Sequence, residues 1–377
     1  MENQARYFLL YLKTGGGHLA PAKSIAKTIT EKSHGSINPV LIDGLEKSNS
    51  FVRTIIEDGY RQSQSKAIWV FEMLYAFHKI KIFAFITTWL LSIFIKPYLK
   101  ERILNEKPQK IIIFHFFLIK PVLEIIEKQK LNITPLIIVT DPFTAPPIWF
   151  LHKKGKFIVF SQELKNNLQH KIPEENVEVF PFILDKKFAK PFSQNEIIEK
   201  KKILGFDPDK KVTLILGGGD GMPRGKSILR NLVKKNVEGE IAIVCGKNEA
   251  LLTYAINLKL KQNLKNLKIF GYIDFVNELL NISDVVITKA GASTFMEILM
   301  AQKVPVINNY IWEQEKGNVD YVLKNKFGLY EKRIHKLPQL INQLLTNPDT
   351  YQQYQQQIKC SKLENGNEKV TDFILAI

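Results

Sequence analysis

Residues 285–297 read Val-Val-Ile-Thr-Lys-Ala-Gly-Ala-Ser-Thr-Phe-Met-Glu. The apolar run Val285–Thr288 is typical of a buried strand, and the residues after Gly291 favour a helix. A strand, a glycine turn and a helix in this order place free backbone N–H groups of a helix N-terminus at the end of a strand, where they bind anions such as a diphosphate. The stretch therefore predicts an α/β fold; taken alone, its helix start favours a capped helix over an anion site, and the residues that follow decide between the two.

The same alternation of strand and helix runs through the rest of the chain. Short runs rich in Ile, Val and Phe predict buried strands, and alternation with helices predicts parallel sheets covered on both faces. The expected strands are Tyr7–Leu12, Lys110–Phe114, Leu136–Thr140, Phe157–Phe160, Val177–Phe180, Val212–Leu216, Ile241–Cys245, Leu267–Phe270, Val285–Thr288 and Val304–Asn308. The expected helices include Pro21–Glu31, Lys226–Lys235, Glu249–Asn263 and Thr294–Ala301.

The length of 377 residues suits two α/β domains better than one. A polar, Lys-rich stretch, Leu184–Lys200, predicts the linker between them. We expect a first domain over residues 1–190, a second over 191–355, and a final segment over 356–377 that packs back on the first. Open parallel sheets bind ligands at the carboxyl ends of their strands, so two such domains would face each other across a central cleft.

The chain is strongly basic, with 53 Lys and Arg against 37 Asp and Glu. Such an excess attracts polyanions, but it is spread along the chain and no nucleic-acid-binding module is recognisable, so no nucleic-acid partner is expected. The two cysteines suit neither a disulfide framework nor a metal site. Asp207-Pro208-Asp209 precedes a strand and predicts a turn, so no metal is expected. A polar N-terminus without a secretory leader predicts a cytoplasmic protein.

Two further glycine turns follow predicted strands. Thr14-Gly15-Gly16-Gly17-His18 comes after the first strand, and Gly217-Gly218-Gly219-Asp220-Gly221 comes after Val212–Leu216. The first turn is neither a dinucleotide fingerprint nor a Walker A loop. His18 stands at its mouth and is either a functional residue or a histidine that caps its helix. Both glycine runs are also compatible with plain tight turns.

Polar side chains follow the strands of the second half. Glu297 lies one helical turn after the glycine turn and could accept hydrogen bonds from both hydroxyls of a ribose. The alternative is a capping box, Thr294-x-x-Glu297, in which Glu297 serves only its own helix. Gln314 and Asn318 are four residues apart, so they share one face of a helix, either for recognition or as an ordinary polar face.

Together these motifs resemble the monogalactosyldiacylglycerol synthase and processive diacylglycerol glucosyltransferase group. That group is related to the transferase that adds N-acetylglucosamine to the undecaprenyl precursor of peptidoglycan. The resemblance rests on Gly-Gly-Gly-His near the N-terminus, Lys289-Ala290-Gly291, Glu297 and Gln314-Glu315-Lys316-Gly317-Asn318. It covers nearly the whole chain and implies a GT-B fold, with two Rossmann-like domains and a UDP-sugar donor bound mainly by the second.

The resemblance also implies roles for single residues. Glu297 would bind the ribose, Gln314 and Glu315 would contact the transferred sugar, and Asn318 would place the donor. The diphosphate would be held by Gly291, Ala292, Ser293 and Thr294, with Gly217, Gly218 and Gly219 also on the donor side. Two departures concern the acceptor: His115-Phe116 stands where the family has His-Pro, and Phe180-Pro181-Phe182-Ile183 replaces a Gly-Ile-Pro turn.

An inverting transfer needs a base for the acceptor hydroxyl. His18, His115 and Asp141 each end or follow a first-domain strand, and we select His18 and Asp141 as the catalytic pair. The alternatives are a turn before proline for Asp141 and a satisfied core histidine for His115. We place His115, with Gly16 and Gly17, on the acceptor side.

The first domain also carries an apolar segment, Ile82–Ile95, between Lys81 and Lys96. A spanning helix needs about 20 residues, so this one should lie in the membrane interface. Lys and Arg outnumber Glu over residues 61–110, which suits an anionic membrane surface. Its apolar and aromatic contacts would include Phe85, Trp89, Trp69, Tyr75 and Tyr98. The alternative is a buried core helix or a dimer contact.

The resulting hypothesis is an inverting glycosyltransferase that moves a hexose from a UDP-sugar to a membrane lipid, most simply diacylglycerol, at the inner face of the cell membrane. Alternatives are a polyprenyl-linked or other lipid acceptor, or a catalytically silent UDP-sugar-binding subunit of a partner transferase. Glucose, galactose and N-acetylglucosamine donors fit the sequence equally.

Overall fold

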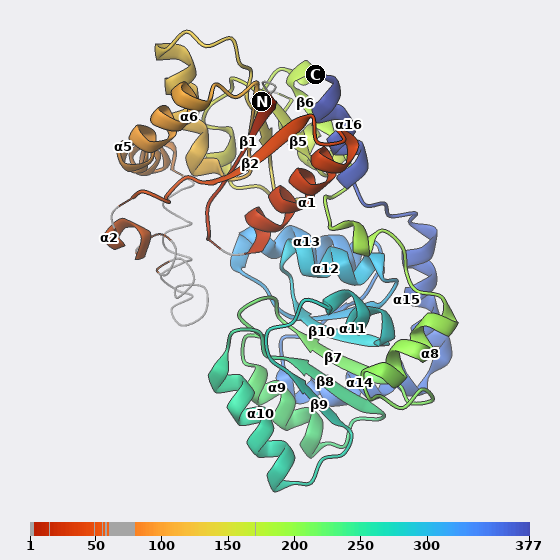
Figure 1. Cartoon of the computed structure of the whole chain (residues 1–377). Helices are drawn as coiled ribbons and strands as arrows, with labels where there is room; N and C mark the ends of the chain where they lie inside the picture. Colours follow the sequence, from red (N-terminus) through yellow and green to blue (C-terminus); the bar gives the residue numbers. More distant parts are fainter. Residues whose placement is uncertain are drawn as a thin grey trace. The chain divides into compact units, whose positions relative to one another are not determined.

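The computed structural model contains two α/β units and describes residues 4–377 except 15, 49, 55, 57, 58, 60–79 and 170 (Figure 1). One unit comprises residues 1–186 and 365–377, and the other comprises residues 187–364. The first crossing between units therefore lies between Lys186 and Lys187, just before the expected position at 190. Gly15, Trp69 and Tyr75 lie outside the described residues.

The first unit is built on a six-stranded sheet in the order β2-β1-β3-β4-β5-β6, and all its strand pairs are parallel. Leu9 in β1 pairs with Leu41 on one side and with Ile112 on the other. The strands are β1 Ala5–Tyr11, β2 Ile37–Asp43, β3 Lys110–Ile113, β4 Leu136–Ile138, β5 Lys156–Val159 and β6 Val177–Val179.

The second unit repeats this plan with the order β12-β11-β10-β7-β8-β9, again all parallel. Leu214 in the central strand β7 pairs with Ala242 in β8 and with Val286 in β10. The strands are β7 Val212–Leu216, β8 Glu240–Val244, β9 Leu267–Phe270, β10 Val285–Lys289, β11 Val304–Asn309 and β12 Leu329–Tyr330. The expected strands of both halves are thus confirmed.

Two strands were not expected, and both lie at a sheet edge. β2 contains Asn38 and Pro39, which interrupt the apolar pattern; proline is tolerated there because an edge strand has one unpaired side. β12 has only two residues, too few for a periodic pattern.

Helices connect the strands and cover both sheets. In the first unit they are α1 Gly16–Lys32, α2 Ser50–Arg53, α5 Lys81–Glu106, α6 Ile119–Lys128, α7 Gln162–Asn166 and α16 Asn367–Ala376. In the second unit they are α8 Gln194–Ile203, α9 Gly225–Lys234, α10 Glu249–Lys261, α11 Val276–Ile282, α12 Ala292–Met300, α13 Trp312–Lys324, α14 Leu337–Thr346 and α15 Pro348–Cys360.

Helix α1 begins earlier than expected, at Gly16 rather than near Pro21. Proline is favoured in the first turn of a helix, which suggested a start near Pro21. In the structure Pro21 lies in the second turn and is buried against the sheet. Because proline has no N–H, the carbonyl of Gly17 receives no helical hydrogen bond from position 21. The glycine turn is therefore the first turn of the helix itself.

Helix α5 is also longer than the expected apolar segment. Its second half is anchored in the core of the first unit by Tyr98, Leu99 and Ile103. Among the described residues, Ile82–Glu106 is a helix long and apolar enough to cross a membrane, by length and composition alone, and 33% of its apolar window is buried.

The C-terminal segment returns to the first unit, where α16 packs beside α1 although the two come from opposite ends of the chain (Figure 1). The return begins at Asn365, so the expected start at residue 356 is corrected. The reason is that α15 continues unbroken to Cys360 and packs on the second unit through Ile358 and Tyr351, whose hydroxyl donates to the Asp284 carbonyl.

Candidate active site

The order in which successive strands join the first sheet reverses between β1 and β3. β2 lies on one side of β1, and β3 with all later strands lies on the other. Loops diverge at such a switch point, and this opens a crevice at the carboxyl ends of the two strands. The glycine turn after β1 and His115 after β3 meet at this point.

His18 occupies the third position of α1, and its side chain is buried. Its Nδ1 lies 2.7 Å from the carbonyl oxygen of Phe114 and 2.9 Å from the hydroxyl oxygen of Thr140. A carbonyl oxygen can only accept, so Nδ1 carries the ring hydrogen and the neutral ring has its lone pair on Nε2. That tautomer can accept a proton at Nε2.

Burial lowers the pKa of His18 to about 4, although the Phe114 carbonyl acts in the opposite direction. The ring is therefore neutral near pH 7, the form that a general base requires.

His115 has the opposite tautomer. Its Nδ1 accepts from the backbone N–H of Phe117, so Nε2 carries the hydrogen and donates to the Thr14 hydroxyl at 3.1 Å. Burial, and also the neighbouring His18, hold the pKa of His115 well below its usual value. The ring centroids of the two histidines are 4.4 Å apart. Both nitrogens of His115 have partners, so it suits a supporting role.

Asp141 lies at the same sheet edge, after β4. Its Oδ2 accepts from the indole N–H of Trp149 at 2.8 Å, and this bond joins the two ends of the loop between them. Trp149 is fully buried, and its ring lies 6.3 Å from that of His18. The structure thus brings Asp141 and His18 to one edge, while the Nδ1 contacts of His18 go to Phe114 and Thr140. Sequence reasoning missed Thr140; its position as the last residue of an expected strand was the available signal.

Gly16 and Gly17 leave open space in the first turn of α1. A Cβ atom added to either glycine would meet no other atom within 4 Å. This open space lies at the start of α1, where the first N–H groups of a helix have no partner within the helix.

The second sheet has its own switch point, between β7 and β10. The loop after β7 carries Gly217, Gly218 and Gly219. Gly217 admits no side chain, because a Cβ would lie 2.3 Å from the Cα of Met222. Gly218 has φ +85°, and its Cβ position would lie 4.0 Å from the Thr294 hydroxyl, so this loop adjoins the first turn of α12. Both donor-side glycine turns therefore lie next to each other.

The N-terminus of α12 is capped by Gly291, which has no side chain, followed by Ala292, Ser293 and Thr294 inside the helix. Thr294 is therefore not the N-cap, and the capping-box interpretation of Thr294 and Glu297 is wrong. The first N–H groups of a helix have no partner within the helix, so this first turn offers donors that suit an anion. Glu297 lies one turn further along the helix, on the same element.

Helix α13 supplies two buried side chains beside this turn. Asn318 donates through Nδ2 to the carbonyl of Ala290 at 2.7 Å, while its Oδ1 is buried and has no hydrogen-bond partner among the described residues. A buried amide oxygen without a donor is costly, and a bound ligand could supply one. Glu315 accepts from the N–H of Ile311 at 2.7 Å, and its other oxygen lies 4.0 Å from the ammonium of Lys289. Gln314 precedes Glu315 in the first turn of α13.

The exposed face of α5 is apolar. Phe85 and Trp89, which we assigned to the membrane side, are about half exposed (50% and 49%). The ammonium of Lys120 lies 5.3 Å above the ring of Phe85. Other large apolar side chains that are exposed on this helix are Ile82, Phe83, Ile86, Leu90, Ile93 and Phe94.

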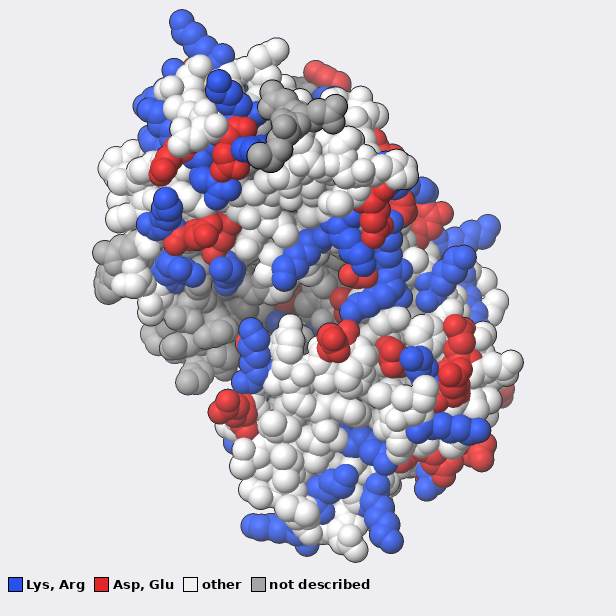
Figure 2. Space-filling model, viewed as in Figure 1, with Lys and Arg blue, Asp and Glu red and all other residues white. Residues whose placement is uncertain are grey.

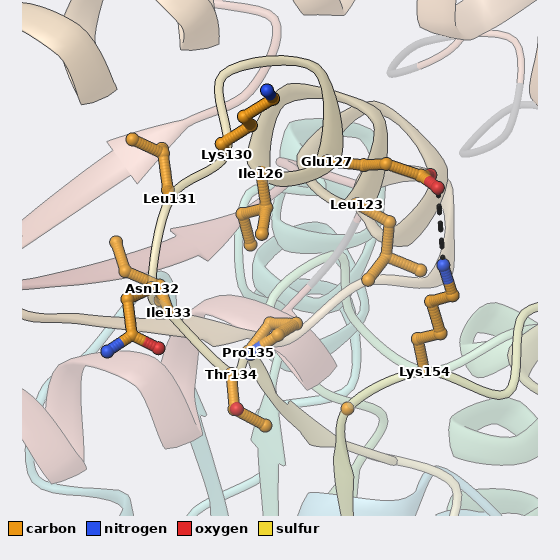
Figure 3. Close-up of a pocket in the computed structure, with 11 residues that line it drawn as sticks. Leu123, Ile126, Glu127, Lys130, Leu131, Asn132, Ile133, Thr134, Pro135 and Lys154 are labelled. Atoms are coloured by element: carbon orange, nitrogen blue, oxygen red, sulfur yellow. Dashed lines mark hydrogen bonds and ion pairs between the residues drawn. The ribbon is translucent and has the colours of Figure 1, made fainter.

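Two grooves lie on the first unit. A groove of about 460 Å³ is lined by Leu123, Ile126 and Lys154, and Glu127 pairs with Lys154 beside it (Figure 3). It adjoins residues that precede β4 and β5, so it lies at the edge opposite to His18. A second groove of about 320 Å³, lined by Phe143, Phe150 and Leu168 among others, borders the loop between Asp141 and Trp149.

Asp207 and Asp209 form the expected turn, in which the Asp207 side chain accepts from the N–H of Asp209 at 3.0 Å. Within the part of the chain that the structure describes, no three His, Cys, Asp or Glu side chains are grouped to hold a metal ion. On the face shown in Figure 2, Lys and Arg are spread over both units with acidic residues among them.

Comparisons with known proteins agree with this arrangement. Residues 18–181 match the family model of monogalactosyldiacylglycerol (MGDG) synthase, and residues 213–370 match the glycosyltransferase family 28 C-terminal domain. Monogalactosyldiacylglycerol synthase 2 of Arabidopsis thaliana is 27% identical, over 88% of this chain and 72% of its own length. The processive diacylglycerol beta-glucosyltransferase of Bacillus subtilis is 26% identical, over 100% of this chain and 96% of its own.

Solved structures match the fold over nearly the full length. MurG of Acinetobacter baumannii superposes with a TM-score of 0.59 at 16% identity, covering 99% of this chain and 100% of that one. Anabaena Alr3699/HepE, solved in complex with UDP, gives a TM-score of 0.58 at 11% identity with the same coverage. The chain is a glycosyltransferase of the GT-B fold, and it is similar over most of its length to the monogalactosyldiacylglycerol synthases and the processive diacylglycerol glucosyltransferases.

Proposed function

We propose that this enzyme transfers a hexose from a UDP-sugar to a membrane lipid, with inversion at the anomeric carbon. The proposed acceptor lipid is diacylglycerol. One observation carries the donor assignment: the N-terminus of α12 and the glycine loop after β7 lie next to each other at a switch point, beside the buried Asn318 oxygen that has no partner among the described residues. The names of the two relatives support diacylglycerol as the acceptor.

The donor would bind through its diphosphate. Residues 291–294 offer backbone N–H groups and the positive end of the α12 dipole, and Lys289 adds a cation beside them. Glu297 would bind the ribose hydroxyls, and Gln314 with Glu315 would contact the hexose. Negative charge grows on the diphosphate as the sugar leaves, so these groups bind the transition state more tightly than the ground state.

The acceptor hydroxyl would lose its proton to His18. The oxygen of the acceptor hydroxyl forms a bond to the anomeric carbon of the hexose. At the same time the bond from that carbon to the diphosphate oxygen breaks, and UDP leaves with the bonding electrons. The proton moves to Nε2 of His18, whose neutral tautomer has the lone pair there. Gly16 and Gly17 leave room for the acceptor, and the apolar groove beside Phe143 and Phe150 suits its hydrocarbon part.

We place the enzyme at the inner face of the cell membrane, in contact with anionic lipid through α5. The charges near the exposed apolar face support this. Lys96 and Lys120 both pair with Glu124, which leaves a net positive charge beside Phe85. Apolar and aromatic side chains with a cationic border suit the boundary between headgroups and acyl chains.

Transfer of labelled sugar tests the proposal. Wild-type protein is mixed with diacylglycerol in anionic micelles and with UDP-glucose, UDP-galactose or UDP-N-acetylglucosamine, beside a Glu297→Ala control. We expect a glycolipid from one donor, and a loss of product with weakened UDP binding in the control.

Other outcomes separate the parts of the proposal. UDP binding that depends on Glu297, without glycolipid from any donor, would refute diacylglycerol as the acceptor and leave the donor site standing. UDP binding that is absent, or unchanged by Glu297→Ala, would refute the donor site.

A further inference from the structure

We infer that Thr140, together with the Phe114 carbonyl, is the group that positions His18 for proton transfer, in place of the carboxylate of Asp141. Thr140 is a positioning residue for the proposed base, so this inference rests on the proposed function. It assigns a role to a residue that the motifs of the chain do not include.

The geometry at Nδ1 of His18 carries the argument. A ring nitrogen has one hydrogen, and two acceptors already lie within hydrogen-bond distance of this one: the Phe114 oxygen at 2.7 Å and the Thr140 oxygen at 2.9 Å. In a serine-protease triad, a carboxylate occupies this position on the histidine, where it sets the tautomer and stabilises the imidazolium. Here two neutral oxygens occupy it.

The carboxylate next to Thr140 is engaged elsewhere. Asp141 accepts from the indole N–H of Trp149 at 2.8 Å, and Trp149 packs edge-on against Phe116. The successive residues Thr140 and Asp141, shortly after β4, therefore have different roles: Thr140 holds the histidine, and Asp141 closes the loop that packs against it.

The two neutral oxygens at Nδ1 affect the pKa of His18. They stabilise the imidazolium less than a carboxylate does, so the base stays neutral over a wide range of pH. Among the described residues, His115 is a titratable group in contact with His18, with a ring-centroid distance of 4.4 Å and a lowered pKa, and Asp141 follows Thr140 directly. Loss of the Thr140 oxygen removes an acceptor from the imidazolium and lowers the pKa of His18 further.

The test compares Thr140→Val with Thr140→Ser and Asp141→Asn. We expect Thr140→Val to lower kcat about tenfold, because the base remains but its orientation is loosened. The donor KM should stay unchanged, and the acid limb of the pH–rate profile should move to lower pH. Thr140→Ser should restore both the rate and the limb. Asp141→Asn should leave the acid limb in its wild-type position, whatever its rate.

A second measurement does not depend on the acceptor. ¹⁵N NMR of the imidazole rings, with the His18 signal identified by its loss in His18→Gln, should show the hydrogen on Nδ1 in the wild-type protein. A hydrogen on Nε2, or a Thr140→Val enzyme with the wild-type rate and acid limb, would overturn the inference. An acid limb that moves in Asp141→Asn instead would assign the role to Asp141. Absence of glycolipid from the wild-type enzyme would refute only the proposed acceptor, because the NMR result is obtained without it.

Discussion

His18 and His115 lie in contact at one edge of the first sheet, but they have opposite tautomers because each Nδ1 meets a different backbone group. A carbonyl faces Nδ1 of His18, and an N–H faces Nδ1 of His115. The sequence predicted that both rings would lie at this edge, since each follows a strand. It could not predict the tautomers, because they depend on Phe114, Thr140 and Phe117 at hydrogen-bond distance. The backbone of a turn has no signature in the side-chain pattern.

Buried neutral histidines make the stability of the first unit dependent on pH. The pKa of His18 is about 4 in the folded protein, below the value near 6.5 of an unfolded chain, so the unfolded chain binds the proton more readily. The contribution of His18 to the free energy of unfolding is fully present above pH 6.5. It is lost as the pH falls toward 4, and the loss is about 3 kcal/mol.

Denaturant unfolding between pH 7 and pH 4 measures this loss. His18→Gln should lose about 3 kcal/mol less stability than the wild-type protein over this range. The exposed His335→Gln should follow the wild-type curve. A His18→Gln variant with the same pH dependence as the wild-type protein would show that His18 titrates normally.

At the scale of single elements, the turn from β10 to α12 is the part of the site that the sequence predicted best. The turn from β10 to α12 follows the expected order, since strand, glycine and helix form within a few consecutive residues. The contact of Asn318 with the Ala290 carbonyl joins α13 to this turn across 28 positions. Spacing along α13 indicated a shared face for Gln314 and Asn318, but it could not show that Asn318 is buried.

Asn318→Ala should weaken both the turn and the donor site. The Ala290 carbonyl would lose its donor, which costs about 1–3 kcal/mol when the group is buried. We expect UDP affinity to fall about tenfold, which corresponds to ~1.4 kcal/mol. Calorimetric titration with UDP measures it. Asn325→Ala at the other end of α13 is the matched control, because Asn325 bonds only to the Tyr321 carbonyl of its own helix in the contacts described. Equal affinity in Asn318→Ala and in the wild-type protein would contradict the role.

Helix α5 should attach the protein to anionic membranes through its apolar face. Trp89→Glu combined with Ile93→Glu places two charges on this face, so binding to anionic vesicles should fall at least tenfold in a flotation assay. Leu260→Glu is the matched control, because Leu260 is an exposed leucine (73%) on α10 of the second unit. Vesicle binding that is equal in all three proteins would exclude α5 as the membrane contact.

At the scale of the whole molecule, the two sheets and their order of elements could be predicted from the sequence, because buried parallel strands are nearly continuous apolar runs. The edge strands could not, and neither could the residue at which the C-terminal segment returns to the first unit, Asn365 rather than 356. That return depends on side-chain contacts between distant segments: Asn367 bonds to Ser24 and to the Leu184 carbonyl, and Asn365 accepts from the Leu184 N–H. Pairing across more than 180 residues has no local signal.

Gly366→Ala should release this C-terminal segment. A Cβ atom at position 366 would lie 1.8 Å from the carbonyl oxygen of Pro181, so the backbone must move and α16 loses its place beside α1. We expect a fall in stability of about 2–4 kcal/mol for the first unit, with UDP binding by the second unit retained. Limited proteolysis should then cleave near residue 365. Unchanged protease resistance would show that α16 does not depend on this contact.

The most direct test of the account is glycolipid synthesis by the wild-type enzyme and by His18→Ala, measured beside UDP binding in both. The account predicts that the wild-type enzyme converts an α-linked UDP-hexose and diacylglycerol into a β-glycosyl-diacylglycerol. His18→Ala should bind UDP as tightly and form product at least about a hundredfold more slowly, as expected when a general base is removed. An α-linked product, or wild-type turnover in His18→Ala, would contradict the account.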